Sequence, residues 1–176
     1  MTELACTPGQ TVGPFLGLGL PYTGDSHLVG DEHPHAVRLH GTVYDGAGQA
    51  VPDALVELWQ PDGGGRIAHR AGSLRRDGTS FTGWGRCATD AAGHYSFTTV
   101  APGSGESGRA PFFALAVFAR GLLDRLFTRA YLPHDDATAD PAIAGLVCIP
   151  ESGCAGYRFD IHLQGPNETV FLEYRR

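Results

Sequence analysis

The sequence predicts an all-β sandwich in a single domain, with an extended N-terminal arm and at most one short helix. About eight short apolar or alternating segments run along the chain, and clusters of Gly, Pro or Asp separate them. The 25 Gly and 12 Pro are scattered without a period, which is typical of turns between strands and of neither collagen nor disorder. A chain of 176 residues can bury roughly 70% of its unfolded surface, which suffices for one hydrophobic core.

The boundary between arm and core is expected at residue 36. Residues 1–35 are irregular and rich in Gly and Pro, which favours a segment that extends over another surface, belonging either to this chain or to a second one. Residues 36–176 hold the regular apolar segments. They are therefore expected to form the β-sandwich core.

The strands are justified by their periodicity. In residues 36–44 apolar and polar side chains alternate, which predicts a half-buried strand. Residues 54–60 carry apolar side chains on both faces, and Phe112–Phe118 is continuously apolar, so both are expected in the interior of a sheet. Further strands are expected at 81–89, 95–100, 111–119, 126–132, 157–163 and 169–174.

One segment has the spacing of a helix. In residues 136–146, Ala142, Ile143 and Leu146 recur at helical intervals, and Asp135 or Asp136 can cap the N-terminus. This is the single helix that the sequence predicts.

Charge and composition exclude several classes of function. The formal net charge is −6, which repels phosphate backbones and anionic membranes, and Arg75-Arg76 is a short basic pair. All 13 basic residues are Arg, so Schiff-base and lysine general-base chemistry are excluded. No run approaches the roughly 18 apolar residues of a membrane helix.

The N-terminus and the cysteines indicate the compartment. Residues 1–6 have neither a positive segment nor a long apolar one, so a cytoplasmic protein is expected. The four cysteines, Cys6, Cys87, Cys148 and Cys154, lack Cys-x-x-Cys spacing and are most simply free thiols. A bridge between Cys148 and Cys154 stays open as an alternative.

Spacing alone gives no self-contained active site. His33 and His35 flank a proline in the arm without a third ligand nearby in sequence, and His162 fits a solvated or partner-facing strand. Neither His-Glu-x-x-His nor Gly-x-Ser-x-Gly occurs, and the Gly-Ser-rich stretch at 103–108 is typical of a loop.

Several blocks nevertheless resemble a known family. In order and at suitable intervals, LHGTVYD (39–45), LWQPD (58–62), GHYSFTT (93–99) and YRFDI (157–161) are similar to segments of the intradiol ring-cleaving dioxygenases. TPGQTVGPF (7–15), FARG (118–121) and QGPNETVF (164–171) resemble in particular the alpha subunits of its two-subunit members. The resemblance spans nearly the whole chain.

The resemblance implies an iron site whose ligands are missing here. Members of the family hold Fe(III) with two tyrosines and two histidines, and phenolate oxygens are hard anionic donors that suit this ion. The matching positions carry Ile67, Gly105, Phe112 and Ala114. None of these side chains coordinates iron, so this chain is expected to bind no metal and to have no catalytic residue of its own.

The resemblance also implies a partner and a reaction. A beta subunit of similar fold is expected to hold the ferric ion, and protocatechuate would be cleaved there by dioxygen to 3-carboxy-cis,cis-muconate. Protocatechuate carries a carboxylate, which an arginine recognises well. By resemblance, Thr11 and Arg120 are the residues expected to be lent to this shared pocket, with Arg129 as a second choice.

Two other interpretations remain open at this stage. A free-standing β-sandwich that binds a protein or a carbohydrate would explain the missing ligands equally well, although it would not need the segment 7–15. An iron enzyme with displaced ligands such as His94 and Tyr95 is the third.

Overall fold

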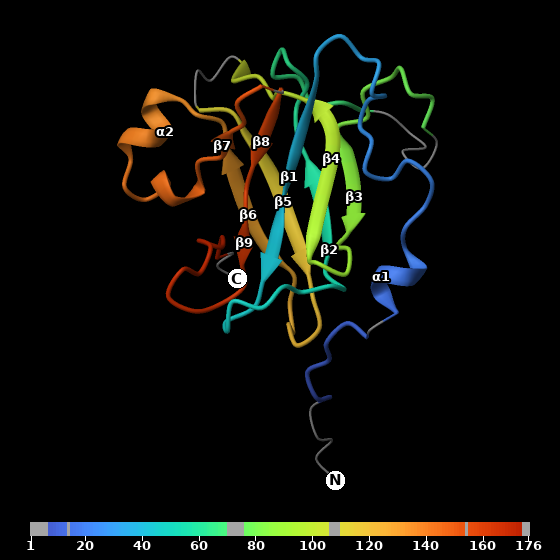
Figure 1. The fold of residues 1–176 in the computed structure, drawn as a ribbon, viewed down its shortest axis with the longest axis vertical. Helices are drawn as coiled ribbons and strands as arrows, with labels where there is room; N and C mark the ends of the chain where they lie inside the picture. Colours follow the sequence, from blue (N-terminus) through green and yellow to red (C-terminus); the bar gives the residue numbers. More distant parts are fainter. Residues whose placement is uncertain (1–6, 14, 70–75, 106–109, 154, 174–176) are drawn as a thin grey trace, which may run out of the picture.

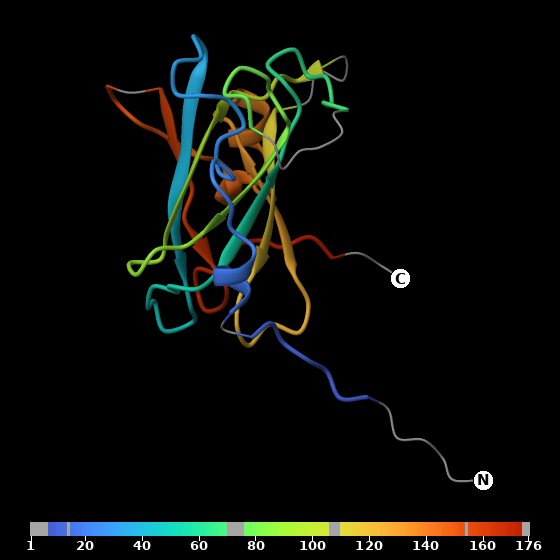
Figure 2. The same cartoon turned by 90° about the vertical axis from the view of Figure 1, so that its right-hand side faces the viewer.

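The structure is a computed structural model that describes residues 7–13, 15–69, 76–105, 110–153 and 155–173. Among these residues two β-sheets face each other as separate layers, which Figures 1 and 2 show from two sides. The first sheet has the order β4-β1-β8-β7, with β9 also paired to β1, and the second has the order β3-β2-β5-β6. This confirms the predicted all-β sandwich.

The elements occupy the following ranges. The first sheet contains β1 (Ala36–Tyr44), β4 (His94–Val100), β7 (Ile149–Pro150), β8 (Gly156–Arg158) and β9 (Ile161–His162). The second contains β2 (Leu55–Trp59), β3 (Trp84–Ala88), β5 (Phe112–Phe118) and β6 (Leu126–Tyr131). The helical turns are α1 (Leu16–Gly19), α2 (Asp135–Ala139) and the 3-10 turn η2 (Ala144–Leu146).

The core fills the space between the two sheets. On β5, Phe113, Leu115 and Val117 are buried, whereas Phe112 and Ala114 on the opposite face are only half-buried. The expectation that β5 is covered on both faces therefore holds only around Ala116, the one buried residue on its outer face. The half-buried outer face at the start of β5 leaves room for a site there.

β1 is the central strand of the first sheet. It runs antiparallel to β4 and parallel to β8 and β9. The backbone of Gly41 passes so close to the carbonyl oxygen of Phe159 that a Cβ would clash with it. The hydroxyl of Tyr95 on β4 donates a hydrogen bond of 2.5 Å to the same oxygen. A glycine in β1 thus allows the C-terminal strands to join the sheet.

Three predicted elements differ from the structure. The strand predicted at 157–163 is divided into β8 and β9, and at the break the carboxylate of Asp160 accepts the amide of Thr42 on β1 at 3.0 Å. The helix predicted at 136–146 is wrong as a continuous helix: Pro141 lacks an amide hydrogen, and α2 ends before it.

The strand predicted at 169–174 is the third difference. Residues 169–173 form no strand, although they lie alongside β6. The amide of Leu172 donates to the carbonyl of Phe127 at 2.7 Å, and the hydroxyl of Thr128 donates to the carbonyl of Val170 at 2.8 Å. These two contacts are too irregular for a ladder. Residue 174 lies outside the described residues.

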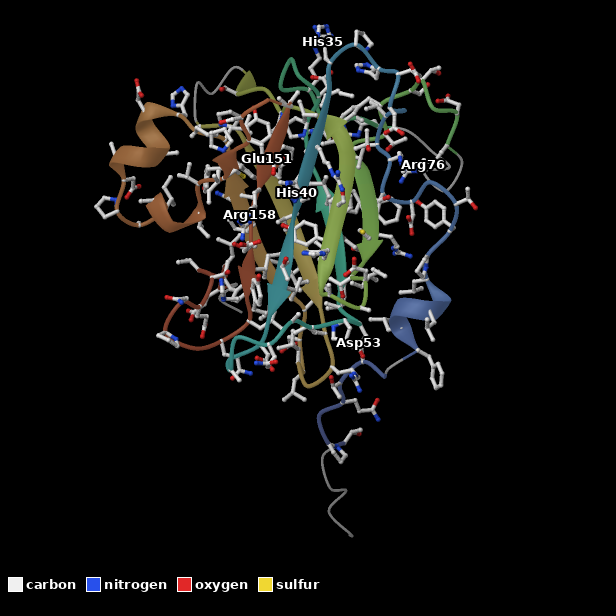
Figure 3. All side chains as sticks on the ribbon, in the orientation of Figure 1. His35, His40, Asp53, Arg76, Glu151 and Arg158 are labelled. Atoms are coloured by element: carbon white, nitrogen blue, oxygen red, sulfur yellow. The ribbon has the colours of Figure 1, made fainter. Side chains whose placement is uncertain are left out.

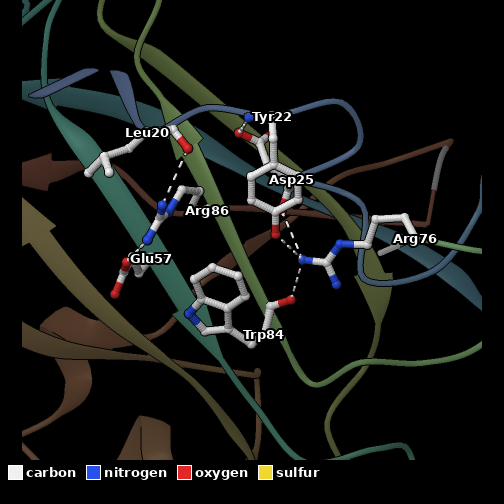
Figure 4. Close-up of polar contacts among 7 residues, drawn as sticks. All are labelled: Leu20, Tyr22, Asp25, Glu57, Arg76, Trp84 and Arg86. Atoms are coloured by element: carbon white, nitrogen blue, oxygen red, sulfur yellow. Dashed lines mark hydrogen bonds and ion pairs between the residues drawn. The ribbon is translucent and has the colours of Figure 1, made fainter. Parts of the chain in front are cut away.

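Part of the predicted arm packs on the sandwich of its own chain. Leu28 and Val29 are fully buried, and His27 pairs with Thr98 on β4. Figure 4 shows how arginines hold the preceding segment: Arg76 Nη2 donates to the Tyr22 hydroxyl at 3.0 Å and to the carbonyl of Trp84 at 2.9 Å. Residues 22–29 are therefore attached to β3 and β4.

Candidate functional site

A pocket lies at the end of the sandwich where β2 and β6 finish and β5 begins. Its volume is about 620 Å³, and it is lined by loop residues that include Ile67 and Ser104 and by strand residues that include Phe112, Arg129 and Tyr131. This volume is in the range of small-molecule sites in proteins. The loop after β2 and the segment between β4 and β5 both contribute to its wall.

Close backbone packing positions the loop side of the pocket. The carboxylate of Asp62 accepts the amides of Gly64 and Arg66, both at 2.9 Å, which closes the turn that precedes Ile67. Gly65 has a φ of +80°, and a Cβ on it would clash with the backbone of Gly105. Glycine at 65 therefore brings the two loops together, which a bulkier residue would prevent.

The strand side of the pocket is aromatic and cationic. The rings of Phe112 and Tyr131, which are paired across β5 and β6, lie 5.4 Å apart and are tilted by 55°. The guanidinium carbon of Arg129 lies 4.5 Å from the centre of the Phe112 ring, and Nη1 donates to the Tyr131 hydroxyl at 3.3 Å. Arg129 and Tyr131 share a face because side chains two residues apart on a strand point the same way.

The structure gathers the four positions that the sequence analysis singled out as vacated ligand sites. Ile67 and Phe112 line the pocket, and Gly105 lies against Gly65, which also lines it. Ala114 is two residues along β5 on the same face as Phe112 and lines an adjoining groove that shares Phe112 and Arg129. The four therefore surround one region, although Ala114 stands beside the pocket proper.

Thr11 and Arg120 come together at the opposite end. Arg120 follows the far end of β5, where its Nε pairs with the carboxylate of Asp53, and the Thr11 hydroxyl accepts the amide of Gly121 at 2.8 Å. In Figure 3, Asp53 lies at the end opposite His35, and His35 shares a groove with the Gly63-Gly64 turn beside the pocket. Thr11 and Arg120 therefore do not reach this chain's own pocket.

Comparison with known proteins identifies the family. The Dioxygenase family matches residues 23–165. The chain is 36% identical to the protocatechuate 3,4-dioxygenase alpha chain of Burkholderia cepacia, over 98% of this chain and 100% of that protein. The chain belongs to the intradiol ring-cleavage dioxygenase family.

Two further relatives place it within this family. The protocatechuate 3,4-dioxygenase beta chain of Burkholderia cepacia is 33% identical over 76% of this chain and 66% of that one. Among solved structures, the dioxygenase domain of a dioxygenase carbohydrate-binding protein fusion from Streptomyces sp. SirexAA-E has a TM-score of 0.62 and 26% identity, covering 80% of this chain and 87% of that one. Homologues of this chain are thus subunits of intradiol dioxygenases.

The intradiol dioxygenases depend on iron, and the pocket residues do not suit a ferric ion. Phe112 and Ile67 offer only apolar surface, and the guanidinium of Arg129 places a positive charge where a trivalent cation would need anionic donors. Asp140 and Tyr131 are the acidic and phenolic groups on the lining. Across the described ranges, no three His, Cys, Asp or Glu side chains converge as a metal site would require.

The alternative ligands His94 and Tyr95 do not meet. They are neighbours on β4 and point to opposite faces, with His94 exposed and Tyr95 buried in the core. The Tyr95 hydroxyl is engaged with the Phe159 carbonyl at 2.5 Å, and burial raises its pKa well above the usual value. A phenolate at this position is therefore disfavoured, and these two side chains do not converge on one site.

None of the other histidines and cysteines that the structure describes lines the pocket. The rings of His33 and His35 are 6.1 Å apart, and His162 stacks on Tyr44 at 4.9 Å. Cys148 is a buried free thiol whose pKa is raised to about 12 by desolvation, and desolvation also raises the pKa of Cys87. Cys6 and Cys154 lie outside the described residues, so the alternative bridge stays untested.

Part of the pocket was not predicted from the sequence. Tyr131 and Asp140 are absent from the residues expected above, and Arg129 is expected there only as a second choice for the shared pocket. The sequence does contain a signal for Arg129 and Tyr131, because they alternate with buried Thr128 and Ala130 on β6 and so share the outer face.

The part of the chain that the structure describes has no helix long and apolar enough to span a bilayer.

Proposed function

We propose that this chain is the non-iron alpha subunit of a protocatechuate 3,4-dioxygenase and that a beta subunit of similar fold holds the ferric ion. The observation that carries the proposal is the pocket at the Phe112–Tyr131 end, where a guanidinium and a phenyl ring stand beside the positions of expected ligands. Similarity to an alpha chain over 98% of the sequence supports the assignment of subunit type.

On this proposal, ring cleavage takes place in the complex of the alpha and beta subunits. Fe(III) in the beta subunit would activate protocatechuate toward dioxygen, and the ring would open between its two hydroxylated carbons to give 3-carboxy-cis,cis-muconate. Both atoms of dioxygen enter the product. This chain would contribute the interface and one wall of the shared pocket.

The residues proposed for that wall are Arg120 and Thr11. The Arg120 side chain is 56% exposed although its Nε pairs with Asp53, so part of the guanidinium remains available to an incoming carboxylate. The planar donor fork of arginine suits a carboxylate. Thr11 holds the segment before α1 onto the Arg120 loop through the Gly121 amide.

A free-standing binding module is the weaker alternative. Its fold would be the same, but similarity to alpha chains extends through the N-terminal segment as well as the sandwich. A module that acts alone has no need of an arm whose Phe15 and Leu18 are 76% and 75% exposed. Such exposed apolar side chains are more consistent with a contact to another subunit.

Co-expression with the beta subunit tests the proposal. The expected product is a coloured, iron-containing complex that contains both chains and consumes oxygen with protocatechuate. Each chain expressed separately is the matched control. A chain that stays monomeric and colourless beside its candidate partner, with no oxygen uptake in the mixture, would overturn the proposal.

A further inference from the structure

We propose that the pocket at the Phe112–Tyr131 end binds an aromatic carboxylate by itself, without a metal. This is a binding site in addition to the shared pocket of the proposed function. It depends on this chain's residues alone: the cation of Arg129, the hydroxyl of Tyr131 and the apolar walls around them.

The cation is held in place and has no anionic partner. The Phe112 ring supports one face of the Arg129 guanidinium at 4.5 Å, and the Tyr131 hydroxyl accepts from Nη1 at 3.3 Å. Within the described part of the chain, no carboxylate pairs with Arg129. A half-buried guanidinium that is already oriented loses little side-chain entropy when it binds an anion.

A carboxylate would also find a second donor. The Tyr131 hydroxyl uses a lone pair to accept from Arg129, which leaves its own proton free to donate to a carboxylate oxygen. The guanidinium and the hydroxyl lie next to each other on β6. Together they form a two-point site for one carboxylate group.

The walls suit a flat ring. Phe112 and Tyr131 form a tilted aromatic pair at 5.4 Å, and Ile67, Pro111 and Ile143 add apolar surface from three separate segments. The volume of about 620 Å³ exceeds what one benzene ring with a carboxylate needs, so the pocket has room for such a ligand.

The pocket also discriminates by charge. Asp140 lines it, and the Asp140 Oδ1 accepts the amide of Ala142 at 2.9 Å, which fixes that carboxylate at the wall. A ligand with a second carboxylate would add a further negative charge to a pocket whose lining already holds one, which is unfavourable. Aromatic monocarboxylates are therefore the ligand class that the structure assigns to the pocket.

Titration calorimetry of the full-length chain with benzoate tests this site. Benzoate has no hydroxyl groups, so its binding does not depend on chelating iron. We expect saturable binding at a ratio of one, with a Kd of about 1 mM or tighter. Benzamide, which has the same shape without the charge, should bind at least about tenfold more weakly.

Two arginine variants complete the test. Arg129→Gln should weaken benzoate binding by about tenfold or more, because it removes the cation. Arg125→Gln is the matched control: Arg125 also lies over a phenylalanine, Phe127 at 4.9 Å, but outside this pocket. It should change the Kd by less than about twofold.

The outcomes are distinguishable from one another and from the proposed function. Circular dichroism establishes whether each variant folds, and the titration of the wild-type chain alone already decides the main point. No saturable heat up to about 10 mM benzoate would overturn the proposal, as would equal affinity for benzamide or for benzoate in Arg129→Gln. Oxygen uptake by the complex reports on the partner's iron separately, so either proposal can fail without the other.

Discussion

The Nε of Arg120 pairs with the carboxylate of Asp53, while 56% of the Arg120 side chain remains exposed. The pair joins the loop after β5 to the turn before β2 at one end of the sandwich. It therefore aims the guanidinium without burying it. The role proposed for Arg120 in a neighbouring subunit's pocket would need such an exposed guanidinium.

The first prediction concerns this arginine. In the alpha-beta complex, Arg120→Ala should remove about 1.5 to 3 kcal/mol of substrate binding, or roughly 10- to 150-fold in kcat/KM for protocatechuate, because a charge-assisted hydrogen bond to the carboxylate is lost. Arg120→Lys should recover part of this loss. Steady-state oxygen uptake measures both variants.

Arg125→Ala, in the same loop, is the control for that experiment. It removes an exposed arginine that stacks on Phe127, and its kcat/KM should stay within about twofold of wild type. If Arg120→Ala behaves like Arg125→Ala, Arg120 has no role in the pocket.

The second prediction concerns Thr11. Its hydroxyl accepts the Gly121 amide at 2.8 Å, so Thr11→Val should loosen the arm beside Arg120 and lower kcat/KM of the complex by about two- to tenfold. Thr11→Ser keeps the hydroxyl and should be close to wild type. Equal values for the serine and valine variants would show that this hydrogen bond does not matter.

The third prediction uses pH to test the core. Tyr95→Phe should destabilise the chain by about 1 to 2 kcal/mol at pH 7, because the Phe159 carbonyl loses its donor. Burial holds the Tyr95 pKa in the folded state well above the ordinary 10.0. The unfolded state therefore releases this proton first, so the contribution of Tyr95 is complete below pH 10 and declines as the pH rises further.

Urea unfolding of wild type and Tyr95→Phe at several pH values measures this effect. The difference between the two unfolding free energies should be constant from pH 7 to about 9.5 and shrink above about 10. A difference that grows in alkali would contradict a buried, protonated Tyr95.

The fourth prediction concerns the close approach at Gly41. A Cβ at this position would clash with the Phe159 carbonyl, so Gly41→Ala should lower the free energy of unfolding by about 2 kcal/mol or more. Gly145→Ala is the matched control, because no atom lies within 4 Å of a Cβ built there. It should change stability by less than about 0.5 kcal/mol. Similar losses in both variants would mean that the sheet accommodates a methyl group at Gly41.

Sequence reasoning located the strands that have a clear period or a continuous apolar run. Residues 36–44 and 112–118 follow from side-chain alternation and from apolar content, which local sequence contains. The division of 157–163 was not predictable in this way, because the contact at the break joins Asp160 to Thr42, which is 118 residues distant in sequence. The helix at 136–146 was expected on apolar spacing, although Pro141 was a local signal against it.

The site was predictable only in part. Resemblance to the family pointed to Ile67, Gly105, Phe112 and Ala114, and the fold brings them to one end of the sandwich. Arg129 stacks on Phe112 through strand pairing, and Asp140 reaches the pocket from the loop after α2. Neither relation follows from spacing along the chain, because both depend on tertiary contacts.

Metal analysis of this polypeptide, purified alone and together with the beta subunit, decides whether this chain binds iron. We expect less than about 0.1 iron per chain for the polypeptide alone and about one iron per alpha-beta pair for the complex, because Phe112 and Arg129 occupy the region where ligands would be needed. Stoichiometric ferric iron bound to the polypeptide by itself would contradict this expectation.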